Sequence, residues 1–295
     1  MQGRRVFGAI LLVLVAAVAA PGAQALLPNQ SRIYVSIMDG KVAATAPRDA
    51  EAFHVWESGV SRPVVSASPA AEAPSIVVII HGFERGETAD ARKALTAFVD
   101  AIRAGSPNAR IALIGDVKTP QLTNITTDAA KLDEFARRFA VSGTNMVFFE
   151  TIVDAAKALG KEASDRRIIV TLTKSTKYDS DTAATQRTVD ILKKSHASVW
   201  SIDVTPENAG SISNMHATTE MEGFVGHAFE YSGGAGDRIF GTTSLPAAMT
   251  RFAGLILAQY QVTFERPDRP GETELRVGVS GVATEKVIGP GWFVR

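Results

Sequence analysis

The central part of the chain alternates between short apolar runs and amphipathic stretches. Almost unbroken apolar or β-prone runs, which are typical of parallel strands buried on both faces, lie at residues 75–80, 111–114, 168–172 and 199–204. Apolar residues three or four positions apart predict helices at 88–104, 128–140, 145–159, 182–194, 216–231 and 246–257. The pattern predicts an α/β fold: a doubly wound, Rossmann-like, mostly parallel sheet with helices on both faces.

The segments before and after this α/β part have a different pattern. Residues 31–66 and 260–294 alternate apolar and polar positions between turn pairs, which is typical of small antiparallel strands. Neither segment alone buries enough apolar area to be stable, so we expect them to form one small antiparallel β subdomain beside the sheet, with Phe53 or Trp56 touching residues 272–294. The Pro/Ala-rich residues 67–74 (ASPAAEAP) are expected to be a linker.

The first 25 residues have the features of a secretory signal peptide. Arg4 and Arg5 precede an apolar run at 9–20, and Ala23-Gln24-Ala25 is a small-x-small cleavage site. A membrane span needs about 20 apolar residues, and this run is shorter, so no stable membrane anchor is expected. We therefore expect cleavage after Ala25 and a periplasmic or secreted protein. The expected organisation is 1–25 signal peptide, 26–74 N-terminal β segment and linker, 75–258 α/β domain, and 259–295 C-terminal β segment.

Charge and cysteine content narrow the function classes. The chain has 31 basic and 31 acidic residues, and removing Arg4 and Arg5 leaves 29 against 31, a net charge of about −2. Such a balance provides no field for attracting nucleic acid or an anionic membrane. The absence of cysteine excludes disulfides, and 270 residues can bury a core without them. The expected partner is a protein outside the cytoplasm.

Three polar segments lie within the predicted α/β region, two after predicted strands and one after the predicted helix 128–140. They are residues 81–85 (HGFER), Ser142-Gly143-Thr144-Asn145, and the segment that begins at Lys174. Together they resemble the strand-end loops of von Willebrand factor type A domains. That resemblance implies divalent-metal binding through Asp-x-Ser-x-Ser, then Thr, then Asp. Here the first motif reads His81-x-Phe83-x-Arg85 and Lys174 replaces the final Asp, so that only Thr144 of the implied ligands remains.

The replaced residues change the expected chemistry of this site. Mg²⁺ prefers oxygen ligands including a carboxylate, and two cationic side chains would repel it. We therefore expect neither metal nor cofactor. Strand ends at a switch point of the sheet form a crevice, so we expect a pseudo-metal site there that could accept a partner's carboxylate. Its residues are His81, Phe83, Arg85, Thr144 and Lys174. Alternatively, Glu84 or Asp179 neutralises the cluster from within.

The flanking segments narrow the resemblance. Residues 34–37 and 53–59, together with Tyr260, Gly291-Trp292 and Arg295, resemble a bacterial subgroup, the von Willebrand factor A-related family of Acidobacteria. Its members have one β segment before the domain and another after it. The first loop of that subgroup usually retains Asp and Ser, so this chain departs from the subgroup as well.

Other kinds of chemistry have weaker support in the sequence. Residues 77–83 also resemble the strand and oxyanion loop of α/β-hydrolases, but the Gly-x-Ser-x-Gly elbow of such enzymes does not occur in the sequence. His227 and Glu230 form a pair without a third metal ligand, and Asp203 is more readily a loop hydrogen-bond partner than a ligand group. The sequence favours an exported, non-catalytic interaction or scaffold module. The alternatives are an extracytoplasmic hydrolase using the His81 loop and a metal-dependent adhesin with noncanonical ligands.

Overall fold

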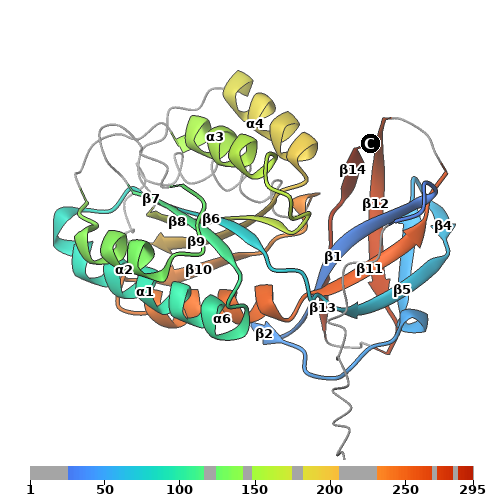
Figure 1. Ribbon diagram of the computed structural model, residues 1–295, viewed down its shortest axis with the longest axis horizontal. Helices are drawn as coiled ribbons and strands as arrows, with labels where there is room; N and C mark the ends of the chain where they lie inside the picture. Colours follow the sequence, from blue (N-terminus) through green and yellow to red (C-terminus); the bar gives the residue numbers. More distant parts are fainter. Residues whose placement is uncertain are drawn as a thin grey trace, which may run out of the picture.

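The computed structural model describes residues 26–115, 124–141, 148–174, 182–205, 231–267, 271–281 and 285–294. Its centre is a parallel five-stranded sheet in the order β10-β9-β8-β6-β7 (Figure 1). The strands are β6 (Ser75–His81), β7 (Arg110–Ile114), β8 (Arg167–Lys174), β9 (Ser198–Thr205) and β10 (Gly236–Phe240). The predicted central position of β6 is confirmed, because Val78 is in register with Leu113 of β7 and with Val170 of β8.

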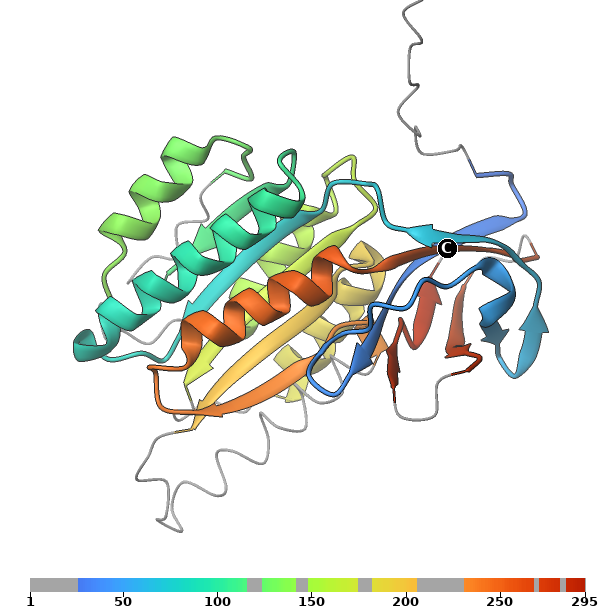
Figure 2. The same ribbon diagram turned by 90° about the horizontal axis from the view of Figure 1, so that it is seen from below.

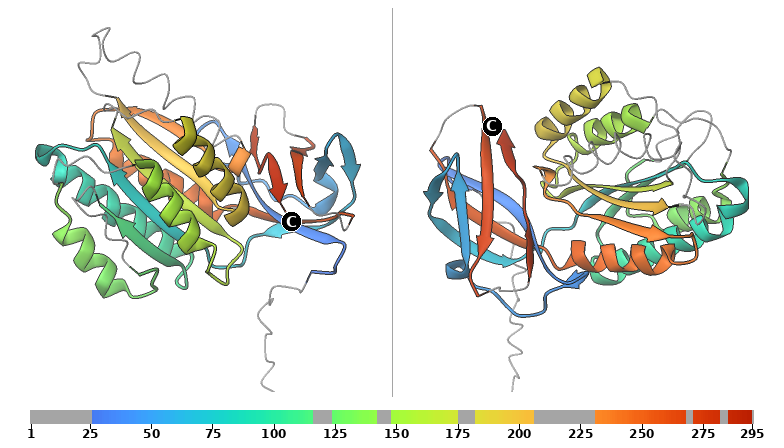
Figure 3. Two further views of the ribbon diagram at one scale, coloured as in Figure 1. Left: turned by 90° about the horizontal axis from the view of Figure 1, so that it is seen from above. Right: turned by 180° about the vertical axis from the view of Figure 1, so that it is seen from behind.

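Helices cover both faces of this sheet, as predicted. On one face lie α1 (Thr88–Gly105), α2 (Ala129–Arg138) and α6 (Leu245–Leu257), and on the other lie α3 (Phe148–Leu159) and α4 (Thr182–Ser195) (Figures 2 and 3). Side chains of β6 point alternately to the two faces of the sheet. Ile76, Val78 and Ile80 pack toward α1, while Val77 and Ile79 pack toward α3. All five side chains are fully buried, and each such burial contributes about 1.5–3 kcal/mol relative to exposure. We call β6 to α6 the α/β body.

The two flanking segments form a β-sandwich beside this body. One sheet has the order β13-β1-β11-β5, with β2 paired to β1, and the other has the order β14-β12-β3-β4. The N-terminal strands are β1 (Gln30–Asp39), β2 (Val42–Ala43), β3 (Phe53–Glu57), β4 (Val60–Arg62) and β5 (Val64–Pro69), with the 3-10 turn η1 (Ala50–Ala52) before β3. The C-terminal strands are β11 (Tyr260–Glu265), β12 (Glu272–Val279), β13 (Lys286–Ile288) and β14 (Trp292–Val294).

The pairing of the two segments is confirmed, and one detail is corrected. Phe53 is opposite Val279 and Trp56 is opposite Arg276, so β3 and β12 are neighbours. The expected linker 67–74 is shorter than predicted, because its first three residues belong to β5 and pair with β11. Pro69 ends this edge strand, where a residue without an N–H group is tolerated. Only residues 70–74 connect the sandwich to β6.

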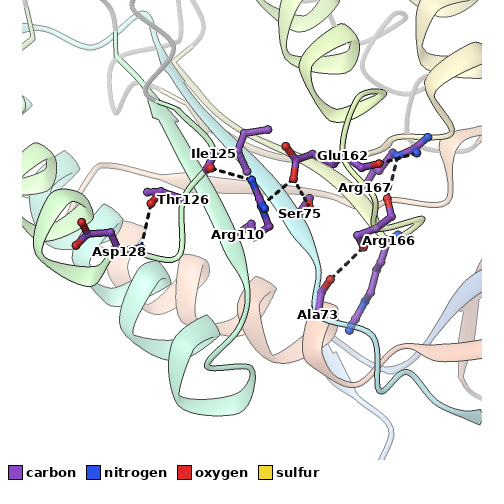
Figure 4. Close-up of polar contacts among 10 residues, drawn as sticks. Ala73, Ser75, Arg110, Ile125, Thr126, Asp128, Glu162, Arg166 and Arg167 are labelled. Atoms are coloured by element: carbon purple, nitrogen blue, oxygen red, sulfur yellow. Dashed lines mark hydrogen bonds and ion pairs between the residues drawn. The ribbon is translucent and has the colours of Figure 1, made fainter. Parts of the chain in front are cut away.

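The amino ends of the parallel strands face the sandwich, and their carboxyl ends lie at the far end of the α/β body (Figure 1). A polar network holds the amino ends together (Figure 4). Glu162 forms an ion pair with Arg110 at 2.8 Å and accepts a hydrogen bond from the Ser75 hydroxyl at 3.5 Å. Arg167 donates to the Glu162 carbonyl oxygen at 3.1 Å. The starts of β6, β7 and β8 are thereby linked.

Some predictions lie outside the described residues. They include the signal peptide at 1–25, Thr144, Asp179, the His227–Glu230 pair, and the predicted helix 216–231 except its last residue. Among the helices that are described, we find none with the length and apolar character needed to cross a membrane.

Candidate functional site

The sheet changes winding direction between β6 and β8. From β6 the chain passes to β7 on one side and later to β8 on the other, and His81 is in register with Thr173. The loops after both strands therefore leave the same edge, which is where parallel α/β sheets hold their ligands. This carboxyl edge is the location that the sequence predicted for the pseudo-metal site.

Lys174, the last residue of β8, is held by two carboxylates of the loop after β6. Its Nζ lies 2.9 Å from Glu87 Oε1 and 3.3 Å from Glu84 Oε1. Burial alone would lower the pKa of Lys174, but the hydrogen bonds and charges of Glu87 and then Glu84 outweigh it and raise that pKa. The side chain is 13% exposed, so its ammonium charge is balanced inside the loop rather than by solvent.

The short turn η2 (Arg85–Glu87) sets this geometry. The Glu84 N–H donates to the Glu87 carboxylate at 2.8 Å, and the Glu84 side chain reciprocates in a capping box. One Glu87 oxygen therefore orders the turn while the other binds Lys174. Glu87 was missed from the sequence, where its spacing of three residues from Glu84 was the available signal.

His81 and Phe83 lie inside the molecule. The His81 side chain is buried and stacks on Phe148 of α3, with ring centroids 5.3 Å apart and an interplanar angle of 28°. Burial lowers the pKa of His81 to about 4, so the imidazole carries no charge at neutral pH. Phe83 is 2% exposed and belongs to the apolar core that includes α1. Arg85, in contrast, is exposed at the start of η2.

The other half of the edge carries a second group of side chains. Asp203 of β9 accepts a hydrogen bond from the Thr173 hydroxyl at 3.5 Å and lies 3.6 Å from the Arg238 guanidinium of β10. Phe240, at the end of β10, is 73% exposed. It was missed from the sequence, although an aromatic residue at a strand end before Gly241 was a usable signal. This edge therefore combines exposed charge with an exposed ring.

The residues at the end of β8 do not fit a divalent cation. An ammonium group already occupies the two carboxylates, and a second positive charge beside it would be repelled. Within the ranges that the structure describes, no three His, Asp or Glu side chains gather into a possible metal-ligand group. The present chemistry of the site is an internal salt bridge.

The solved structures that are similar to this chain include von Willebrand factor type A domains. One similar solved structure is a von Willebrand factor type A protein from Catenulispora acidiphila, with 13% identity and a TM-score of 0.48 over 90% of this chain and 75% of that chain. Another is the SpRpn10 VWA domain, with 17% identity and a TM-score of 0.45 over 59% of this chain and 94% of that one. A third is an aerotolerance-related membrane protein from Bacteroides fragilis that carries multiple mutations to serine. It has 11% identity and a TM-score of 0.42 over 62% of this chain and 98% of that chain.

No protein-family model matches the chain, and no curated protein matches it in sequence. The similarity to these structures concerns the course of the backbone. At 11–17% sequence identity, the chemistry of the site has to be argued from the residues of this chain.

Proposed function

We propose that this chain is an exported, non-catalytic protein-interaction or scaffold module whose contact surface is the carboxyl edge of the parallel sheet. The observation that supports the proposal is the Lys174 ammonium, held by Glu87 and Glu84 at the end of β8. In the resembling domains this position carries a metal-ligating Asp. Here the Lys174 ammonium itself links β8 to the loop after β6, and we take this link as the replacement for a metal ion.

A protein partner would meet this edge through exposed groups. Glu84 is the weaker ligand of Lys174, since it lies farther from Nζ and its side chain is 79% exposed. An acidic side chain of a partner can replace Glu84 on the ammonium while Glu87 remains in place. Arg85 adds positive charge, and Phe240 offers an aromatic anchor of the kind that is enriched at interface hot spots.

A double variant tests the contact surface. Lys174→Asp combined with Arg85→Ser reverses one positive charge of the edge and removes another, and we expect it to lose partners captured by the wild type from a native envelope extract, as identified by mass spectrometry. The control is Lys157→Asp combined with Arg276→Ser, which alters two exposed cations on α3 and β12. If the edge variant captures the same partners as the wild type, the contact surface lies in another part of the molecule.

Titration with Mg²⁺, Mn²⁺ and Ca²⁺ tests the metal-free character separately. We expect no saturable heat for the wild type, because the carboxylates already hold Lys174. Saturable binding that Glu87→Gln abolishes would instead support a metal-dependent adhesin.

The non-catalytic part of the proposal is tested by an esterase screen. We expect no turnover, since a buried imidazole whose pKa is about 4 is a weak base at neutral pH. Activity that disappears in His81→Ala but survives in His54→Ala would support the hydrolase alternative.

A further inference from the structure

A cavity of about 360 Å³ lies between the β-sandwich and the amino ends of the α/β body. Both parts line it: β1 contributes one wall, and the segment leading into β8 and the turn between α4 and β9 contribute the other. Its volume is within the range of small-molecule sites, and such sites occur preferentially where two structural units meet. It is at the opposite end of the parallel sheet from Lys174.

Arg32 faces this cavity because of the alternation along β1. Ile33 and Val35 are part of the sandwich core, so Arg32 and Tyr34 emerge on the other face of the strand, toward the α/β body. The Arg32 side chain is only 8% exposed, and its Nη1 lies 4.0 Å from Asp165 Oδ2. The Asp165 side chain is 59% exposed, and a carboxylate in water weakly offsets a guanidinium charge.

Arg166 and Arg167 also line the cavity, and their guanidinium groups bind neutral acceptors. Arg166 donates to the carbonyl oxygens of Ala70 and Glu72, at 3.4 and 2.9 Å, and to the Gln259 amide oxygen at 3.0 Å. Arg167 donates at 2.9–3.1 Å to the carbonyl oxygens of Ser164, Ser195 and Glu162. Such bonds orient the guanidinium groups without cancelling their charge.

The balance of charge around the cavity is positive. Three arginines line it against one carboxylate, that of Asp165. Glu72 lies close by, where it accepts hydrogen bonds from the Tyr34 hydroxyl and from the Asp165 N–H, but it is not part of the lining. A partly enclosed space with this balance favours an anion.

Part of the remaining lining is apolar, around Trp292. Trp292 is 8% exposed and stacks on Tyr231, with centroids 5.3 Å apart and planes 9° from parallel. Lys193 Nζ lies 5.1 Å from the Trp292 ring centroid, a cation–π contact that also holds the indole. Pro290 extends this apolar wall.

We propose that the junction cavity binds a small organic anion: a carboxylate with a compact apolar body. Arg32 receives the carboxylate, and the Trp292 wall packs against the apolar part. The ligand touches the sandwich and the α/β body at once, so its binding holds the two parts together.

Isothermal titration of the full chain tests this with matched probes. Benzoate and hexanoate are compared with the neutral benzyl alcohol and hexanol, which have nearly the same shape. We expect saturable binding of at least one carboxylate, binding of its alcohol weaker by about tenfold or more, and loss of affinity as salt is raised to roughly 0.5 M. Absence of saturable carboxylate binding, or equal binding of acid and alcohol, overturns the proposal.

Variants then locate the site. Arg32→Met should weaken carboxylate binding by about tenfold or more. Arg276→Met, which removes a 77% exposed arginine of β12, should bind as the wild type does. Asp165→Asn removes the one lining carboxylate from an exposed position and should tighten binding by about two- to fivefold. The Asp165→Asn variant keeps the test valid if Arg32→Met does not fold, and unchanged or weaker binding by Asp165→Asn overturns the proposal.

Discussion

At the scale of single residues, Lys174 shows how one side chain at the end of a strand links that strand to a neighbouring loop. Its ammonium is a point charge on a flexible stem and can reach two carboxylates of a neighbouring loop. The sequence predicted a positive charge here and kept open that Glu84 neutralises it. It did not predict Glu87, because only the turn η2 brings that carboxylate back to β8.

His81 leads to a prediction about pH. Burial lowers its pKa from 6.5 to about 4, so below pH 6.5 the unfolded chain binds a proton that the folded chain refuses. The stability that depends on a neutral His81 is therefore complete above pH 6.5 and is lost as the pH falls toward 4. Between about pH 7.5 and pH 5 the expected loss is roughly 2 kcal/mol.

Urea unfolding at several pH values measures this loss. The expected result is that His81→Leu has a flatter pH profile than the wild type by that amount, whereas His54→Leu, at an exposed position of β3, keeps the wild-type profile. Parallel profiles for the wild type and His81→Leu would mean that His81 is protonated within the fold.

At the scale of elements, the buried strands were predictable because short, continuous apolar runs between amphipathic helices are typical of parallel strands that are covered on both faces. The same patterns placed helices α1, α3 and α4 within a few residues. The direction of Phe83 was not predictable, since the backbone between a strand end and a short turn decides which side of the sheet a loop side chain enters. Likewise, Ala67 looked like part of a linker, and only the presence of β11 beside it makes it part of a strand.

Two glycines give a matched prediction on packing. A Cβ atom added at Gly234 would lie 1.8 Å from the Val199 carbonyl oxygen, so the segment before β10 can approach β9 only with glycine. We expect Gly234→Ala to lower the free energy of unfolding by at least about 3 kcal/mol. Gly254, exposed in α6, has no atom within 4 Å of such a Cβ, and Gly254→Ala should raise the free energy by about 0.5–1 kcal/mol.

Thermal unfolding compares the two variants directly. We expect the highest midpoint temperature for Gly254→Ala, an intermediate one for the wild type and the lowest for Gly234→Ala. Equal midpoints for the two alanine variants would show that the segment beside Val199 shifts freely, contrary to the close approach seen here.

At the scale of the whole molecule, Arg166 joins the two parts where the chain crosses between them. The outgoing crossing lies at residues 70–74 and the returning one at Ala258 and Gln259. Arg166 binds the Ala70 and Glu72 carbonyl oxygens of the first, and the Gln259 amide and Ile256 carbonyl oxygens near the second. These partners are at least 90 positions away in sequence, so local patterns contain no signal for them.

Replacing Arg166 therefore tests the coupling of the two parts. The side chain is 2% exposed, and burial lowers its pKa to about 10, which still leaves it charged at neutral pH. Arg166→Met would strand several buried carbonyl oxygens, and we expect a loss of about 3–5 kcal/mol in the free energy of urea unfolding. Arg166→Lys should lose less, because an ammonium keeps the charge and reaches some of those oxygens but not all. The surface variant Arg276→Met serves as the control and should unfold like the wild type. A loss below about 1 kcal/mol for Arg166→Met would mean that other contacts between the two parts are enough to hold the sandwich on the α/β body.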